Sequence, residues 1–90
     1  MIDSKELLAP AIERLAEQYK LSHREAEVTL SCAEGLTNAA IAERLKVSTE
    51  TIKFHLKNIF DKVGVARRGQ LIAMIFLKEL EKEPKRVVPL

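Results

Sequence analysis

The fold follows from the stretch Val47-Ser48-Thr49-Glu50-Thr51-Ile52-Lys53-Phe54-His55-Leu56-Lys57-Asn58-Ile59-Phe60-Asp61-Lys62-Val63, which reads as one helix with two unlike faces. Ser48 is a residue type preferred at the N-cap, and Val47 and Ile52 stand where a hydrophobic staple would enclose that cap. Apolar residues at the i, i+4, i+7, i+8 and i+11 positions predict the buried face, which consists of Ile52, Leu56, Ile59, Phe60 and Val63.

The opposite face of this helix carries mixed charge and one aromatic ring. At about 100° per residue, the side away from the apolar stripe holds Glu50, Lys53, Phe54, Lys57 and Asp61. Two lysines around a phenylalanine suit a nucleic-acid groove, because cations bind phosphates and base edges and an apolar ring can contact a thymine methyl group. The alternative is a charged helix surface with one stray phenylalanine, since single exposed apolar residues are common.

The positive charge of the chain gathers around the same helix. The net charge of the 90-residue chain is only +2. Between Arg44 and Arg68, however, seven basic residues stand against two acidic ones. A local excess of this kind is what binding to a polyanion requires, so it favours the nucleic-acid interpretation.

Length and composition predict one small all-α domain. The apolar spacing is helical throughout, and β-branched runs with hairpin turns are missing. The longest apolar run, residues 71–77, is too short to span a bilayer, and the N-terminus lacks the pattern of a signal peptide. The single Cys32 excludes an internal disulfide, so we expect a cytoplasmic protein in which this residue packs as a small hydrophobe rather than serving redox or metal chemistry.

The sequence contains no recognisable catalytic, metal or cofactor motif. Its two histidines and one cysteine have no metal-ligand spacing and suggest no nucleophile–base pair. Its three glycines form no phosphate-binding loop. We therefore expect neither an enzyme nor a bound metal or cofactor.

A further helix is predicted at residues 1–20, before the rest of the domain. Its apolar stripe consists of Leu8, Ile12, Leu15 and Tyr19. Pro10 either ends a short first turn or stands in the first turn of the helix proper. The stripe must be covered by the rest of the domain or by a second chain.

Three more helices follow from capping signals and periodicity. Ser22 and Glu25 form a capping box for a helix that ends at Gly35. Thr37 caps a short helix, and a tight connection leads from it to Ser48, which is the helix-turn-helix plan. The last helix is predicted from Arg67-Arg68 to about Glu83, with residues 84–90 as a flexible tail. It is apolar on every side and so requires burial on every side. The core of so small a domain can cover only one side, so the remainder needs either the N-terminal helix or a partner subunit.

At this point the chain resembles a known family. Its motifs, taken in order and at their spacing, resemble the LuxR/GerE-type DNA-binding domain of bacterial transcription regulators. They are Leu21-Ser22-His23-Arg24-Glu25, Gly35-Leu36-Thr37-Asn38, Ile41-Ala42-Glu43-Arg44-Leu45, Val47-Ser48, Thr51-Ile52-Lys53-Phe54-His55, Ile59, Lys62-Val63-Gly64-Val65 and Arg68. The resemblance covers about residues 21–80. It implies an all-α, four-helix LuxR-type helix-turn-helix domain at 21–83, with an additional N-terminal helical extension at 1–20. In that fold the third helix enters the DNA major groove, and the fourth contributes to a two-fold dimer.

The resemblance also implies roles for individual residues. Base edges would be read by Lys53, Phe54 and Lys57. Phosphates would be contacted by Thr37, Asn38, Ser48, Thr51, His55, Lys62 and Arg68. Candidates for the dimer interface on the last helix are Leu71, Met74, Ile75 and Leu77.

Several of these roles have plain structural alternatives. Ser48 and Thr37 serve as helix caps in either case, and His55 is equally consistent with a packed or solvated histidine. Two residues depart from the family pattern. Ala40 replaces the usual acidic residue and removes a capping-box partner, and Phe54 is bulkier than the residues often found at its position.

The expected function is a sequence-specific DNA-binding transcription regulator that binds the major groove of double-stranded DNA as a homodimer through residues 48–63. The alternative is a single-domain interaction module that heterodimerises with a larger transcription regulator and modulates it; RNA polymerase is a further partner to consider. Ninety residues leave no room for the receiver or ligand-binding domain that family members commonly carry. Both a complete small regulator and a piece of a larger one stay open, as do a dimerisation and a linker role for residues 1–20.

Overall fold

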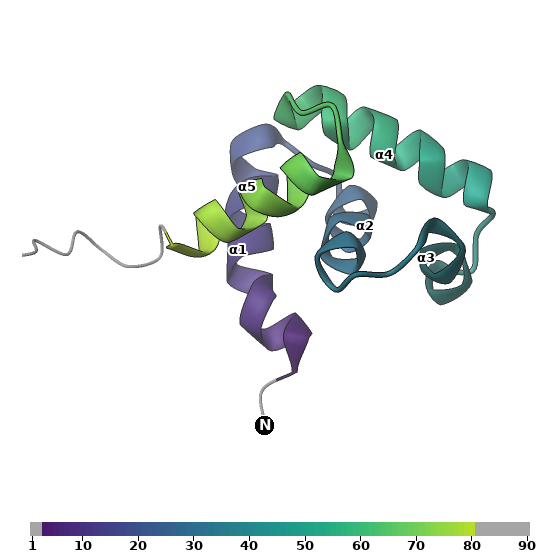
Figure 1. The fold of residues 1–90 in the computed structure, drawn as a ribbon, viewed down its shortest axis with the longest axis horizontal. Coiled ribbons are helices and arrows are strands. Elements are labelled where there is room, and N and C mark those ends of the chain that lie inside the picture. Colours follow the sequence, from purple (N-terminus) through teal and green to yellow (C-terminus); the bar gives the residue numbers. More distant parts are fainter. Residues whose placement is uncertain (1–2, 81–90) are drawn as a thin grey trace, which may run out of the picture.

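Five helices make up the part of the chain that the computed structural model describes, residues 3–80. They are α1 (Ser4–Tyr19), α2 (His23–Ala33), α3 (Asn38–Leu45), α4 (Thr49–Val63) and α5 (Arg68–Leu80) (Figure 1). No strand occurs within residues 3–80, and the all-α prediction is confirmed. The predicted helix end near Glu83 and the predicted tail at 84–90 lie outside the described residues.

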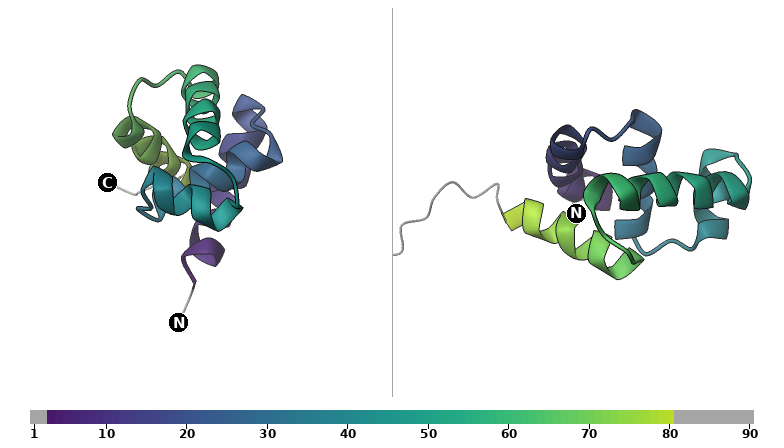
Figure 2. Two further views of the ribbon diagram at one scale, coloured as in Figure 1. Left: turned by 90° about the vertical axis from the view of Figure 1, so that its right-hand side faces the viewer. Right: turned by 90° about the horizontal axis from the view of Figure 1, so that it is seen from above.

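The helix α4 lies along one edge of the molecule. In Figure 1 it forms the upper edge, with α2 and α3 below it. Seen from above in Figure 2, α1 and α5 gather at one end of the molecule, and α3 lies with the first turns of α4 at the other. This arrangement leaves one long side of α4 without a neighbouring helix.

All five helices contribute to one apolar core. Its buried members are Leu8, Ala11, Ile12, Leu15, Val28, Cys32, Ile41, Ala42, Ile52, Leu56, Ile59, Val63, Leu71 and Ile75. The prediction that Cys32 packs as a small hydrophobe is confirmed, because its side chain is fully buried in this cluster. Burial raises the pKa of the Cys32 thiol, with Arg68 acting in the opposite direction. The thiol is therefore kept in its unreactive protonated form.

The helix α1 continues without a break through Pro10, so both predicted alternatives for this proline were wrong. Proline has no N–H to donate to the carbonyl four residues earlier, a loss that costs about 3 kcal/mol in a helix interior. That carbonyl belongs to Glu6, and both Glu6 and Pro10 are exposed, so water can reach it. Burial of Leu8 on one side and of Ile12 on the other stabilises the helix across the proline.

The apolar stripe of α1 is covered within the same chain. α1 packs on α2 and α5. The Arg14 side chain adds a polar contact, because its Nε and Nη2 atoms both donate to the backbone carbonyl oxygen of Lys78, the Nε bond at 3.2 Å. The domain itself, rather than a second chain, therefore supplies the cover that the stripe of α1 requires.

The predicted capping signals of α2 are confirmed. The Ser22 hydroxyl accepts the Glu25 N–H at 3.1 Å, and the Glu25 carboxylate accepts the Ser22 N–H at 2.8 Å. At the other end Gly35 adopts φ 85°, where a side chain would be strained. Its N–H and that of Leu36 donate to the last carbonyls of α2, which turns the chain toward α3.

The turn between α3 and α4 is made without glycine. Lys46 takes the left-handed conformation, with φ 59°, that glycine most often supplies in such turns. The Val47 N–H then donates to the Ala42 carbonyl at 3.0 Å, and Ser48 caps α4 by accepting the Thr51 N–H at 3.1 Å. The helix-turn-helix predicted from this stretch is therefore present, with two residues between the end of α3 and the cap of α4.

Within the single chain the helix α5 is buried on one side only, as predicted for the core of so small a domain. Leu71 and Ile75 are fully buried, and Lys78 is nearly so, on the side that meets α1 and α2. The opposite side leaves an exposed apolar stripe at i, i+3, i+4 and i+7, which consists of Ala73, Phe76, Leu77 and Leu80. The core of so small a domain can cover only one side of this helix.

Candidate nucleic-acid interface

The outward side of α4 is the surface that the sequence predicted. Its buried residues, Ile52, Leu56, Ile59 and Val63, face the core, and Phe60 packs partly against it. The five residues assigned to the outer face are all exposed: Glu50, Lys53, Phe54, Lys57 and Asp61. The Phe54 side chain is 61% exposed, so it is not part of the core. The face therefore presents a phenyl ring beside two lysines.

The two lysines of this face are held loosely. The Lys53 ammonium lies 3.7 Å from the Glu50 carboxylate, and both side chains are largely exposed. A pair of this kind contributes little, because water and salt screen it. Lys57 has no ion-pair partner among residues 3–80. Both ammonium groups can thus turn toward a ligand at little cost.

A groove of about 630 Å³ borders the first turns of α4. Its wall is formed by the start of α3, with Thr37 and Asn38, by Thr49 and Lys53 of α4, and by Arg68. The first turns of α3, α4 and α5 thus border one hollow, and the positive end of a helix dipole favours an anion. Thr49 was missed by the sequence analysis. The signal for it is its position four residues before Lys53, on the same row of the helix.

A second groove, of about 490 Å³, lies on the other flank of α4. Apolar side chains of α4 and the following loop line it, including Phe60 and Val65, and Lys53, Lys57 and Asp61 stand around them. Lys53 belongs to both grooves. Residues of the outer face of α4 thus line both hollows.

Two residues predicted to contact phosphates bind within the protein. The Arg68 guanidinium donates from Nη1 to the Asn38 side-chain oxygen at 2.8 Å and from Nη2 to the Leu36 carbonyl at 2.7 Å. The Lys62 ammonium lies 2.7 Å from the Glu25 carboxylate and 3.4 Å from the Lys20 carbonyl. In the structure Arg68 and Lys62 join helices to one another. Their remaining N–H donors are the ones that a phosphate could bind.

The contact between Lys62 and Glu25 affects the pKa of the Glu25 carboxyl group. Burial alone would raise the pKa of its carboxyl group, but the hydrogen bonds from Lys62 and from the Ser22 backbone outweigh burial and lower that pKa. Glu25 is therefore ionised in the folded protein. One carboxylate closes the cap of α2 and binds the last turn of α4.

Three of the remaining phosphate candidates, Ser48, Thr51 and His55, lie along one edge of α4, and Thr37 caps α3. Ser48 is exposed, and its hydroxyl is 3.0 Å from that of Thr51, which is half-buried. His55 is also half-buried, and its ring lies 6.0 Å from that of Phe54 with the planes tilted by 58°. Thr37 caps α3 by accepting the Ala40 N–H at 3.1 Å. The cap roles of Ser48 and Thr37 are thus present, and their hydroxyls stay accessible.

The structure divides the dimer candidates on α5 into two groups. Leu71 and Ile75 are fully buried in the monomer, where they pack in the core, so their side chains are not on the surface that a second chain would meet. Leu77 is 54% exposed, and Met74 is half-buried. The exposed surface of α5 is the stripe Ala73, Phe76, Leu77 and Leu80, beside the half-buried Met74.

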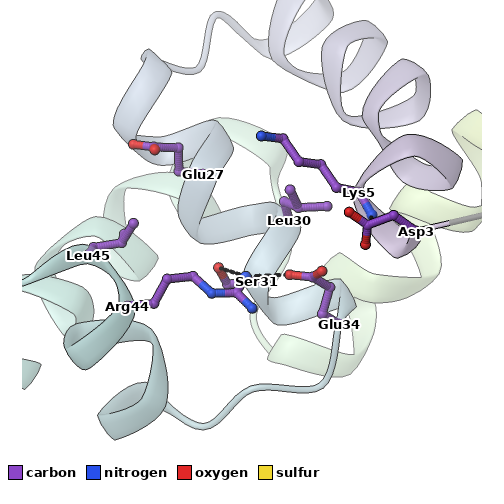
Figure 3. Close-up of a pocket in the computed structure, with 8 residues that line it drawn as sticks. All are labelled: Asp3, Lys5, Glu27, Leu30, Ser31, Glu34, Arg44 and Leu45. Carbon is purple, nitrogen blue, oxygen red and sulfur yellow. Dashed lines mark hydrogen bonds and ion pairs between the residues drawn. The ribbon is translucent and has the colours of Figure 1, made fainter.

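A third hollow, of about 430 Å³, lies between the start of α1, α2 and α3 (Figure 3). Arg44 contacts both the Glu34 carboxylate and the Ser31 hydroxyl on its wall. Within residues 3–80 no group of three or more His, Cys, Asp or Glu side chains is placed to hold a metal ion. None of the helices described is long and apolar enough to cross a membrane.

Comparisons with known proteins agree with this geometry. A probable transcriptional regulatory protein, SgaR of Hyphomicrobium methylovorum, is 44% identical over 54 residues, which are 60% of this chain and 26% of that protein. The transcriptional activator protein EsaR of Pantoea stewartii is 39% identical over 66 residues, 73% of this chain and 26% of that protein. The HTH-type transcriptional regulator MalT of Yersinia pestis is 35% identical over 68 residues, which are 76% of this chain and 8% of that protein.

The chain thus spans about a quarter or less of the length of these relatives. No solved structure matches it significantly. The sequence profile of the family described as bacterial regulatory proteins, luxR family, matches residues 19–75, the segment that holds both the helix-turn-helix and the exposed face of α4. The chain therefore belongs to the LuxR family of bacterial transcription regulators, which bind DNA.

Proposed function

We propose that this chain is a sequence-specific regulator of transcription whose α4 enters the major groove of double-stranded DNA. The observation that carries the proposal is the outer face of α4, where Lys53, Phe54 and Lys57 are exposed together on a helix whose other face is buried in the core. An α-helix fits the major groove, and lysine and phenylalanine are side chains that contact base edges there.

The roles within this interface follow from position. Lys53, Phe54 and Lys57 read base edges. The phosphate contacts come from residues beside them, namely Thr37, Asn38, Ser48, Thr49, Thr51, His55, Lys62 and Arg68. Of these, Lys62 and Arg68 also fix the positions of the helices, so their effect on binding has a structural part. Phosphate contacts set the register of a protein on DNA and base contacts give it specificity.

The regulator acts as a homodimer in this proposal. The exposed stripe of α5 supports it, because contiguous apolar side chains on one helix face mark an interaction site. Two copies joined through α5 would present two α4 helices to an inverted repeat, with half-sites about one helical turn apart. The proposal includes a cytoplasmic location, where bacterial DNA lies, and no catalytic activity.

Selection of bound fragments from random double-stranded DNA tests the proposal most directly. A motif with two-fold symmetry is the expected result. The double variant Lys53→Ala, Lys57→Ala should then lose about 1–3 kcal/mol of affinity for the selected site for each base contact removed, and its preference for the bases at those positions should relax. Circular dichroism establishes that the variant is folded. Full affinity in a folded double variant would exclude this mechanism.

A second candidate is an interaction module that forms a heterodimer with a larger transcription regulator and modulates it. The exposed stripe of α5 favours this function as well, because it offers the same surface to a different chain. The two candidates differ in their DNA binding. The interaction module predicts only weak binding that does not depend on sequence, so a selection that returns no motif would favour it.

A further inference from the structure

Phe54 is a large apolar side chain in a place where packing does not require one. It is 61% exposed on the outer face of α4, and the ring nearest to it is that of the neighbouring His55, 6.0 Å away. The core below is complete without it, since Ile52 and Leu56 of the same helix are buried. A side chain of this size on a face that is otherwise charged points to an apolar partner outside the protein.

The chemistry of a phenyl ring limits what this partner can be. The ring has no conventional hydrogen-bond donor or acceptor, so it cannot read the donor and acceptor pattern of the base edges. On the edges that the four standard bases present in the major groove, the distinctive apolar group is the C5-methyl group of thymine. A phenylalanine at this interface can therefore discriminate directly between bases by contact with that methyl group.

The position of Phe54 relative to the lysines restricts where the methyl group lies. With a rise of about 1.5 Å per residue, Lys53 and Lys57 stand about 6 Å apart along the helix. This distance corresponds to about two steps of 3.4 Å along a DNA strand. Lysine ammonium groups donate to guanine O6 and N7 and to phosphates. The ring thus lies above the short segment of DNA that the two lysines bracket.

We propose that Phe54 reads the C5-methyl group of a thymine in this segment, so that the affinity for a half-site depends on one methyl group. The proposal rests on the proposed function and adds the chemical group that this residue recognises. It explains why an apolar ring stands beside two ammonium groups, where a polar residue would be easier to solvate. It also assigns to Phe54 a role that neither lysine can fill.

The test uses the full 90-residue chain and the duplex obtained by selection from random DNA. Each thymine of a half-site is replaced singly by deoxyuridine, which removes the methyl group and leaves the hydrogen-bonding edge unchanged. At one position the affinity is expected to fall about fourfold, which is the factor that burial of one methylene-sized group contributes. At that position 5-bromodeoxyuridine, whose bromine is close to a methyl group in size, is expected to restore the affinity.

Two variants connect this effect to the ring. Phe54→Ala is expected to bind thymine and deoxyuridine duplexes equally, whereas Phe54→Leu keeps part of the difference. Leu7→Ala is the matched control, because Leu7 is an exposed apolar residue on α1 and its truncation leaves α4 unchanged. This control is expected to keep the fourfold ratio.

The outcomes separate this proposal from the proposed function. Equal affinity for thymine and deoxyuridine at every position, in a protein that still selects a motif, would overturn methyl recognition and leave the DNA-binding function intact. A ratio that persists in Phe54→Ala, or that bromine does not restore, would overturn it as well. Absence of any sequence-selective binding would overturn both proposals.

Discussion

The Lys62 ammonium lies 2.7 Å from the Glu25 carboxylate, although 37 positions separate the two residues in the sequence. The same carboxylate accepts the Ser22 N–H at 2.8 Å. Glu25 thus joins the first turn of α2 to the last turn of α4. The orientation of α4, on which its groove-facing residues depend, is set in part by this pair.

Replacement of Lys62 by methionine should destabilise the fold. The Glu25 side chain is 7% exposed and that of Lys62 is 39% exposed. The variant leaves the carboxylate with its cap bond and no cation, and we expect the free energy of unfolding to fall by about 1–3 kcal/mol, the range for a polar group left unsatisfied. Urea unfolding followed by circular dichroism measures it. Lys57→Met is the matched control on the same helix, because Lys57 is exposed and its loss should change stability by less than about 0.5 kcal/mol. Equal stability of the two variants would show that the pair does not hold α4.

The same pair should make the stability depend on pH. The pKa of Glu25 lies below its ordinary value of 4.5, so the folded protein binds this proton less tightly than the unfolded chain does. The stabilisation is therefore fully present above pH 4.5 and is lost as the pH falls through the lower, folded-state pKa. In Glu25→Gln this contribution is expected to disappear, which flattens the acid limb of the stability curve. Glu43→Gln, which changes an exposed carboxylate on α3, serves as the control. An acid limb as steep in Glu25→Gln as in the unaltered protein would contradict the assignment.

The helix α1 should be essential for stability rather than a passive linker. Leu15 is fully buried where α1 packs on α2 and α5, and its truncation to alanine is expected to cost about 2–5 kcal/mol. Leu7→Ala, on the exposed side of the same helix, should cost less than about 0.5 kcal/mol. Urea unfolding of the two variants provides the comparison. If Leu15→Ala were as stable as Leu7→Ala, α1 would not share the core in solution.

The exposed stripe of α5 should determine the state of assembly. A glutamate in place of Leu77, which is 54% exposed, places a charge in the proposed dimer surface without entering the core. We expect Leu77→Glu to sediment as a monomer and to bind a single half-site more weakly than the intact dimer binds the inverted repeat. Its thermal unfolding, measured on monomers, should match that of the unaltered protein. Leu7→Glu introduces the same charge on α1 and is expected to leave the dimer intact. A dimeric Leu77→Glu would place the interface elsewhere.

The local features of this protein were predictable from its sequence, because their causes lie within one or two helical turns. The capping box of Ser22 and Glu25 spans three residues, and the Ser48 cap bonds to Thr51 at the same spacing. The two faces of α4 follow from the periodicity of a helix, so the exposure of Lys53, Phe54 and Lys57 could be read from their spacing. The resemblance to the LuxR family rested on these same short-range motifs, and the family match confirmed it.

Features that depend on distant partners could not be read in this way. The apolar stripe of α1 was visible in the sequence, but periodicity gives no information on which helix covers it. The helix continues through Pro10 because the helical turns before and after the proline are packed in the core. In the same way, Leu71 and Leu77 look alike on an apolar helix, and only packing against α1 and α2 made one a core residue and the other a surface residue.

The sequence by itself determined where the helices of this protein begin, which side of α4 is apolar and where its positive charge gathers, because hydrogen bonding at caps and helical periodicity act over a few residues. The tertiary structure alone decided that Lys62 binds Glu25 and Arg68 binds Asn38, at separations of 37 and 30 residues. Such pairs form only once burial of apolar side chains has brought the helices together, since the entropy of closing these long loops is offset by the core as a whole rather than by any one contact.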